Sequence, residues 1–154
     1  LDYVDGSRMA IWGWSYGGYM TLLSMMRGGD LFAAGVSVAP VTSWRFYDTI
    51  YTERFMRTPR ENPDGYEQSA PIHPDNVAGL TGDLLLVHGT GDDNVHFQNS
   101  VQLVDELQRQ RKQFDLMIYP NKTHSISGGD ARVHLYTMMT DFLKERLMGP
   151  RATS

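Results

Sequence analysis

A serine at position 15 lies between two glycines, Gly13 and Gly17, in the pattern G-x-S-x-G. The apolar residues 9–12 before the pattern predict a short buried strand, and the residues after it have the apolar spacing of a helix. A sharp turn from strand to helix would raise the Ser15 hydroxyl above a sheet, and the glycines would let the backbone pass without a clash at Cβ. The pattern therefore predicts a nucleophilic serine, with a plain helix-capping serine as the alternative.

A serine hydroxyl is a poor nucleophile at neutral pH, so it needs an imidazole that accepts its proton and a carboxylate that orients the imidazole. Candidates for both follow later predicted strands: first the pair Asp92 and Asp93, then His124. The order serine, acid, histidine is that of the α/β-hydrolases. We interpret Ser15 as the nucleophile and His124 as the general base and then acid, whereas turn chemistry alone leaves either aspartate as the orienting carboxylate.

The other histidines are scattered along the sequence, which also lacks a glycine loop typical of a phosphate site. His88 directly follows a predicted strand, and we interpret it as structural. The sequence has no cysteine, which excludes disulfides, zinc thiolates and a thiol nucleophile. We therefore expect no metal and no organic cofactor.

Strands and helices alternate along the sequence, and this alternation predicts an α/β fold with a doubly wound, mostly parallel sheet and right-handed crossovers. The carboxyl ends of parallel strands meet at one edge, where open α/β sheets carry their sites. On the helix expected at 97–111, the apolar spacing places Val101, Val104 and Leu107 on the inner face. The strands are expected at 9–12, 34–39, 84–87 and 114–119, and the other helices at 16–27 and 130–148.

Residues 42–82 break this alternation, since they hold four prolines and show little periodicity. A long irregular segment inside a compact domain is more often functional than idle. We expect short helices and loops there, lying over the carboxyl edge of the sheet. The strand at 9–12 has no earlier strand to pair with, so we expect it at the edge of a partial sheet that lacks its upstream strands.

The 154 residues are enough for one solid core, and we expect a single domain over 1–154. The apolar fraction of 41% is ordinary for a globular protein, and no run approaches the roughly 20 apolar residues that cross a bilayer. A net charge of −4 argues against a nucleic-acid partner. The sequence begins with neither a signal peptide nor an initiator methionine, so we interpret it as a piece of something longer.

Three segments resemble the catalytic domain of the dipeptidyl peptidases in the prolyl oligopeptidase family of serine peptidases: residues 13–18, 39–55 and 88–97. The resemblance runs from residue 9 to the last helix, and its most specific part is the block H-G-T-G-D-D-N-V-H-F at 88–97. It implies an α/β-hydrolase fold. It also identifies Asp92, the first of the pair, as the acid of the triad.

The activity implied by this resemblance is the removal of an N-terminal dipeptide whose second residue is proline or, less well, alanine. In the same way, Asn94 is implied to contact a substrate carbonyl, Tyr47 to lie near the free amine, and the backbone N–H of Tyr16 to be one oxyanion donor. An aromatic pocket suits a flat apolar ring, and plain core packing is the alternative for these aromatics. The residues that match the family's pocket are Tyr16, Val41, Trp44, Tyr47, Tyr51 and Val95.

The resemblance further implies a second oxyanion donor, a tyrosine hydroxyl before the serine motif, and a β-propeller that binds the substrate amine; we expect both outside this sequence. It implies a homodimer to which the last helix contributes, with Tyr136, Met139, Phe142 and Leu143 as candidates. The absence of cysteine favours a bacterial relative that is periplasmic or extracellular, with the cytoplasm as the alternative.

A triad alone does not separate such a peptidase from an acylaminoacyl-peptidase or an esterase of the same fold. The aromatic residues and Asn94 favour the peptidase. A non-catalytic binding module is a third interpretation, and the intact Ser15 argues against it. We expect the chain by itself to be nearly inactive, because it lacks one oxyanion donor and the amine clamp.

Overall fold

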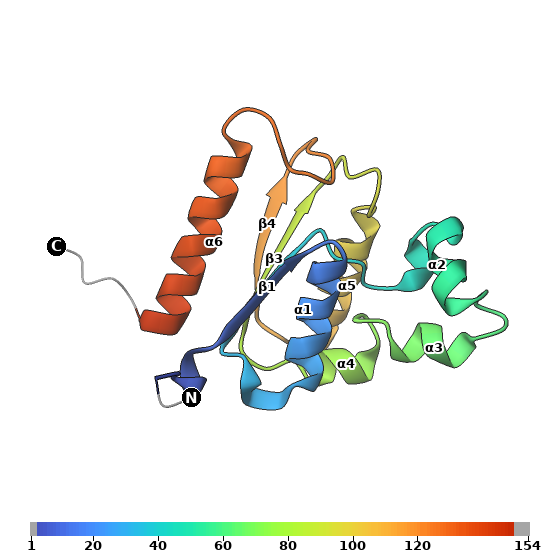
Figure 1. The fold of residues 1–154 in the computed structure, drawn as a ribbon, viewed down its shortest axis with the longest axis horizontal. Coiled ribbons are helices and arrows are strands. Elements are labelled where there is room, and N and C mark those ends of the chain that lie inside the picture. The colour runs from blue at the N-terminus through green and yellow to red at the C-terminus, as the bar shows by residue number, and fades with distance from the viewer. Residues whose placement is uncertain (1–2, 150–154) are drawn as a thin grey trace.

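The computed structural model describes residues 3–149 of the chain. Its sheet has four parallel strands in the order β1-β2-β3-β4, with β1 at one edge and β4 at the other. The four strands are β1 (Ala10–Trp14), β2 (Ala34–Val38), β3 (Asp83–Gly89) and β4 (Asp115–Tyr119). Helix α6 (Ala131–Met148) covers one face of the sheet, while α1 (Tyr16–Arg27) and α5 (Gln98–Arg109) cover the other (Figure 1). The predicted parallel α/β architecture is therefore confirmed.

The core has two layers because successive residues of a strand point to opposite faces of the sheet. In β3, Leu85 and Val87 pack toward α6, whereas Leu84 and Leu86 pack toward α1 and α5. All five residues of β2 are buried, as expected for a central strand of a sheet covered on both faces. Strand β1 is more open, and Trp12 is 52% exposed. Among the described residues β1 pairs with β2 alone, as predicted for an edge strand.

Strand β3 extends further than its apolar run predicts, through His88 and Gly89. These two residues belong to the strand because they pair with Ile118 and Tyr119 of β4, a tertiary contact that hydrophobicity does not reveal. The prediction for the inner face of α5 is wrong at Val101, which is 47% exposed. The buried face starts instead with polar residues, such as Ser100, which find polar partners in the core.

Residues 42–82 form short elements, as predicted. These are the 3-10 turn η3 (Trp44–Phe46) and the helices α2 (Thr49–Met56), α3 (Pro63–Gln68) and α4 (Pro74–Ala78). Local sequence explains them: Asp48 caps α2 by accepting from the Tyr51 N–H, and proline begins both α3 and α4. Two further 3-10 turns are η1 (Gly6–Arg8) and η2 (Gly29–Leu31).

The expected position of this segment is only partly right. Helix α4 lies at the end of the sheet opposite the carboxyl edge, beside the last turn of α1 (Figure 1). The contact is close, since a Cβ on Gly79 would lie 2.2 Å from the carbonyl oxygen of Met26. The first part of the segment reaches the edge where the strands end, since Trp44 of η3 and Tyr51 of α2 line a cavity with Ser15.

The last helix mainly serves the core. Met139 and Phe142 are buried against the sheet and Leu143 packs beside them, whereas Tyr136 is 47% exposed.

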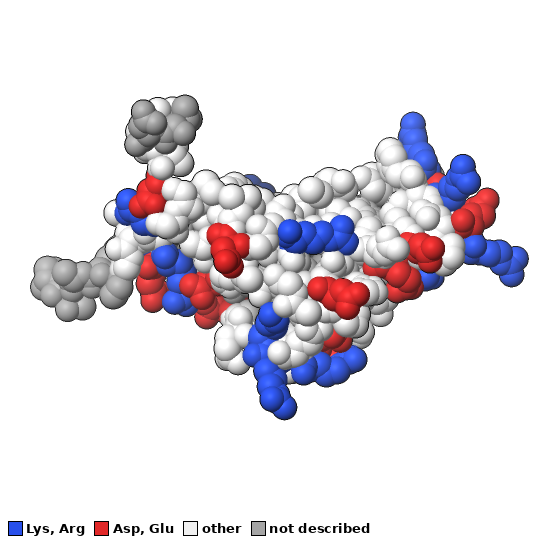
Figure 2. Space-filling view, turned by 90° about the horizontal axis from the view of Figure 1, so that it is seen from below, with Lys and Arg blue, Asp and Glu red and all other residues white. Residues whose placement is uncertain are grey.

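Seen from below, the molecule presents acidic and basic side chains interspersed over one face (Figure 2). Within residues 3–149 no helix combines the length and apolar character needed to span a bilayer.

Candidate active site

Ser15 occupies the turn between β1 and α1 in a conformation that ordinary residues avoid. Its φ of 60° and ψ of −118° differ from the extended values of a typical N-cap residue. The backbone is held there by two hydrogen bonds, from the Ser15 N–H to the Val38 carbonyl (2.8 Å) and from the Tyr19 N–H to the Ser15 carbonyl (3.0 Å). The side chain makes no capping bond, so the hydroxyl is not used to begin the helix. Strain of this kind is typical of functional turns.

Of the two motif glycines, Gly13 has the role that the motif predicts and Gly17 does not. A Cβ on Gly13 would lie 2.2 Å from the carbonyl oxygen of Gly17, so Gly13 is required for the turn. A Cβ on Gly17 itself would meet none of the described atoms within 4 Å. The second close approach belongs to Gly18, where a Cβ would lie 2.8 Å from the carbonyl oxygen of Val38.

Asp92 lies in the loop after β3 and is 5% exposed. Its Oδ1 accepts the backbone N–H groups of Asn94 (3.0 Å) and Val95 (2.9 Å). Its Oδ2 faces two imidazoles, at 2.8 Å from Nδ1 of His124 and 3.1 Å from Nε2 of His88. Asp93 is exposed. The structure thus gives these contacts to the first aspartate of the pair.

The ionised form of Asp92 is favoured despite its burial. Burial alone would raise the pKa of this carboxyl, but hydrogen bonds from His124, His88 and the Asn94 N–H outweigh it. Together they hold the pKa of Asp92 well below its ordinary value. A carboxylate that stays charged at neutral pH can orient an imidazole and stabilise it when it becomes cationic.

His124 follows β4 in a loop that folds back toward the serine turn. Its carbonyl accepts the indole N–H of Trp14 (2.9 Å), the residue directly before Ser15. Ile126, fully buried in the core, anchors the same loop from behind. Among the described residues His124 is hydrogen-bonded to Asp92 but not to Ser15. Catalytic hydrogen bonds are often long without substrate and shorten in the reacting complex.

A small cavity opens directly at the serine. Its volume is about 150 Å³, a size at which an apolar cavity accommodates a ring as large as benzene. The lining includes five of the residues predicted for substrate binding, and the full set is Ser15, Tyr16, Val41, Trp44, Tyr47 and Tyr51. Tyr16 and Tyr51 are 52% and 40% exposed, so these rings are not ordinary core. Val95 is fully buried in the cluster behind the cavity rather than on its surface.

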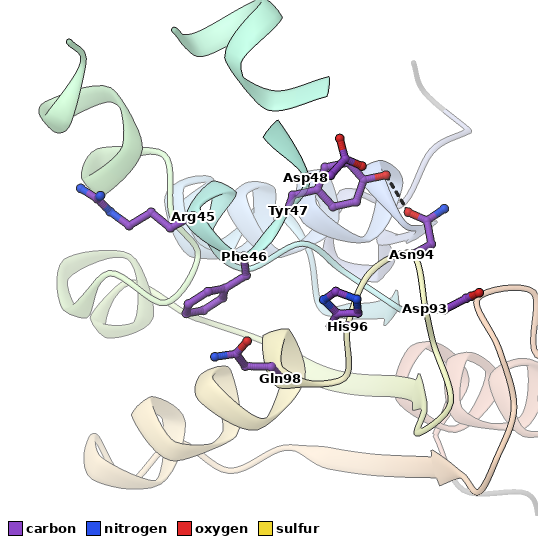
Figure 3. Close-up of a pocket in the computed structure, with 8 residues that line it drawn as sticks. All are labelled: Arg45, Phe46, Tyr47, Asp48, Asp93, Asn94, His96 and Gln98. Carbon is purple, nitrogen blue, oxygen red and sulfur yellow. Dashed lines mark hydrogen bonds between the residues drawn. The ribbon is translucent and has the colours of Figure 1, made fainter. Parts of the chain in front are cut away.

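Asn94 lies on the other side of Tyr47, and the two side chains point toward one another (Figure 3). The Tyr47 hydroxyl donates to Oδ1 of Asn94 at 2.6 Å. The pKa of Tyr47 is raised, first by burial and then by the nearby Asp48. Both residues line a larger, open cavity of about 700 Å³, which also includes Arg45, Phe46, Asp48, Asp93, His96 and Gln98. Tyr47 therefore separates two adjoining cavities.

A parallel sheet covered on both faces, a strained serine after its first strand, and an acid and a histidine after the last two define an α/β-hydrolase. The sequence matches the prolyl oligopeptidase family over residues 1–149, and the chain belongs to that family. A crystal structure of Porphyromonas gingivalis dipeptidyl peptidase 4 superimposes with a TM-score of 0.92 at 53% identity. That comparison covers 96% of this chain and 21% of the other.

Fungal proteins also match the chain over nearly its whole length. A Neurospora crassa protein named "probable dipeptidyl-aminopeptidase B" is 48% identical over 152 residues, which make up 96% of this chain and 16% of the relative. A Coccidioides posadasii protein of the same name is 49% identical over the same length. The chain thus spans about a sixth of the curated relatives that it matches.

Proposed function

We propose that this chain carries the hydrolytic centre of a serine exopeptidase that releases N-terminal dipeptides with proline, or less well alanine, in the second position. The observation that carries the proposal is the aromatic cavity of about 150 Å³ whose lining includes Ser15 itself. A proline ring in this cavity would place its carbonyl carbon beside the serine hydroxyl. The names of the relatives support the dipeptide as the unit of release.

In the proposed mechanism Ser15 attacks the carbonyl carbon of the second residue while His124 accepts the hydroxyl proton. Asp92, bound to Nδ1 of His124, keeps the other nitrogen directed at the serine and stabilises the imidazolium. His124 then returns the proton to the departing amine, which leaves the dipeptide as an ester on Ser15. Water, activated by the same histidine, hydrolyses that ester and restores the hydroxyl.

The tetrahedral oxyanion needs hydrogen-bond donors, and the first residue of α1 offers one. The N–H groups in the first turn of a helix have no partner within the helix. The Tyr16 N–H is therefore available to the substrate oxyanion that forms when Ser15 attacks. We propose that the second donor and the amine-binding groups lie in the rest of the protein. The isolated chain is accordingly expected to be nearly inactive.

Two substrates and one variant test the proposal. The full-length gene product should release the dipeptide from glycyl-prolyl p-nitroanilide, and Ser15→Ala should abolish this turnover. Acetyl-alanyl p-nitroanilide, which has no free amine, serves as the matched substrate. Preferred turnover of the acetylated substrate would favour the acylaminoacyl-peptidase, and Ser15→Ala with wild-type turnover would refute the mechanism.

A fluorophosphonate probe separates a missing nucleophile from a missing binding site, because it reacts with an activated serine and needs little of the substrate pocket. We expect Ser15 to be labelled in the full-length product, and more slowly in the isolated chain. Absence of labelling in both proteins would favour a non-catalytic binding module.

A further inference from the structure

His88 contacts the proposed triad in a way that the sequence does not predict. It ends β3, is fully buried, and packs edge-on against the ring of Phe97 at 5.6 Å. Its Nδ1 lies 2.7 Å from the Ser100 hydroxyl of α5, and its Nε2 lies 2.8 Å from the Val95 carbonyl. The same Nε2 lies 3.1 Å from Oδ2 of Asp92, the oxygen that also faces His124.

The partners of His88 determine where its proton lies. Nε2 faces two acceptors, the Val95 carbonyl and the Asp92 carboxylate, so Nε2 carries the hydrogen. In the neutral ring Nδ1 is then an acceptor, and the Ser100 hydroxyl donates to it. The result is a chain of hydrogen bonds that runs from Ser100 through His88 and Asp92 to His124.

This chain of bonds leaves Asp92 with little freedom. Oδ1 is occupied by two backbone N–H groups and Oδ2 by two imidazoles, so both oxygens have two partners each. A core histidine that only needed one hydrogen-bond partner for each ring nitrogen could have used Ser100 and the Val95 carbonyl alone. The additional bond to Oδ2 couples His88 to the contact that orients His124.

We propose that His88 is a positioning residue for the triad: its Nε2–H fixes the Asp92 carboxylate and shares its charge, and so sets how strongly Asp92 holds His124. The inference rests on the proposed function of Ser15, Asp92 and His124. It concerns a residue that touches neither substrate nor nucleophile.

Removal of this donor has a predictable sign. Among the described residues, the titratable groups around Asp92 are His88 from β3, His124 from the loop after β4, and Tyr47, which directly follows η3. A carboxylate with one donor fewer stabilises a protonated imidazole at His124 more strongly. The acid limb of kcat/KM should therefore move to higher pH, by about 0.5 to 1 unit for one hydrogen bond.

Three variants of the full-length gene product test the proposal, with kcat/KM on glycyl-prolyl p-nitroanilide measured from pH 5 to 9. His88→Leu removes the donor and should lower kcat/KM about 10- to 100-fold, the loss expected for one hydrogen bond to a charged group. His88→Gln keeps an N–H at the same reach and should recover most of this loss. Ser100→Ala removes only the partner of Nδ1, the ring nitrogen of His88 that does not face Asp92. It should give a smaller loss of kcat/KM and a smaller shift of the acid limb in the same direction.

Controls separate positioning from stability. Leu103→Ala removes a fully buried side chain of the core between the sheet and α5, so it should lower the melting temperature without moving the acid limb. A folded His88→Leu protein with kcat/KM within threefold of wild type and an unchanged acid limb would overturn the proposal. If His88→Leu does not fold, an unchanged acid limb in Ser100→Ala overturns it instead.

The proposed function can fail without this inference failing. If the wild-type product releases no dipeptide, the rate at which a fluorophosphonate inactivates Ser15 still reports on the triad. His88→Leu should slow that inactivation and shift its pH dependence in the same direction. Equal inactivation rates in wild type and His88→Leu would refute the role of His88 whatever the substrate.

Discussion

The loops after β3 and β4 carry the proposed acid and base to the same edge of the sheet, but they are held in different ways. The β3 loop is largely self-supporting, since Asp92 accepts the N–H groups of Asn94 and Val95 from its own turn. The β4 loop has a turn bond of its own, from the Ile126 N–H to the Thr123 carbonyl (3.0 Å), but it is also tied to its neighbours. The Lys122 carbonyl accepts the Gly91 N–H (3.0 Å), and the Asn121 N–H donates to the Thr90 hydroxyl (2.8 Å).

This difference separates what local sequence determines from what the fold must supply. The position of the acid is determined within a few residues of its own turn. The position of the base is determined by contacts with the β3 loop and with Trp14 of β1, and by the burial of Ile126 in the core. Changes in the β3 loop should therefore affect both groups, whereas changes at Trp14 should affect the base alone.

The largest effect is expected for Asp92→Asn. The amide can keep the bonds at Oδ1, but its NH2 would face the imidazole nitrogens that now donate to Oδ2. His124 would then favour the wrong tautomer, a change that costs a serine protease about 10⁴-fold in kcat. The exposed neighbour gives the matched control, and Asp93→Asn should stay within about threefold. Similar losses of kcat in Asp92→Asn and Asp93→Asn would show that Asp92 is not the acid that orients His124.

Comparison with Asp92→Asn should also show that part of the wild-type free energy of unfolding depends on pH. Because the pKa of Asp92 in the folded chain lies below its ordinary value of 3.8, its charged form stabilises the fold at all pH values above about 4. That contribution is lost as the pH falls through the folded-state pKa. In urea unfolding, the difference between wild type and Asp92→Asn should be full at pH 7 and shrink below pH 4. A difference that stays constant down to pH 3 would contradict this account.

The next effect is expected for Gly89→Ala, which acts on both loops at once. A Cβ on Gly89 would lie 2.2 Å from the carbonyl oxygen of Lys122, so the β4 loop must move away. Displacement of a catalytic group by about 1 Å costs on the order of 100-fold in rate. We expect that loss in kcat, together with a lower melting temperature.

Gly91→Ala is the control, because its Cβ would lie 3.2 Å from the nearest atoms of Asn121 and a shift of a few tenths of an ångström suffices. It should cost less than tenfold in kcat. Equal losses for the two alanines would mean that the close approach at Gly89 does not set the position of His124.

The same distinction explains how much of the site could be predicted from the sequence. Strands ending in the motifs place Ser15, Asp92 and His124 at one edge, because parallel strands end on the same side. Local chemistry does not decide which of Asp92 and Asp93 is the acid of the triad. Only the family resemblance selects Asp92. Burial and the two imidazoles now distinguish Asp92, and both depend on tertiary contacts.

Other residues escaped sequence analysis for the same reason. His88 reads as a polar residue at the end of a strand, and its partners Val95 and Ser100 meet it only in the folded chain. Ile126 looks like a loop residue, but it is fully buried beneath the His124 loop. Gly18 fits inside a helix and gives no sign that its Cβ would meet the Val38 carbonyl.

The smallest effect is expected for Trp14→Phe, which tests the base without the acid. Phenylalanine keeps an aromatic ring but removes the indole N–H that donates to the His124 carbonyl. One neutral hydrogen bond contributes about 1 kcal/mol, so kcat should fall about fivefold if the bond holds the loop in its reactive position. Trp12→Phe, at an exposed residue on the same strand, should leave kcat unchanged. If Trp14→Phe lowers kcat no more than Trp12→Phe does, the indole bond does not hold the loop after β4 in its reactive position, and the contrast between the two loops reduces to the direct contacts between them.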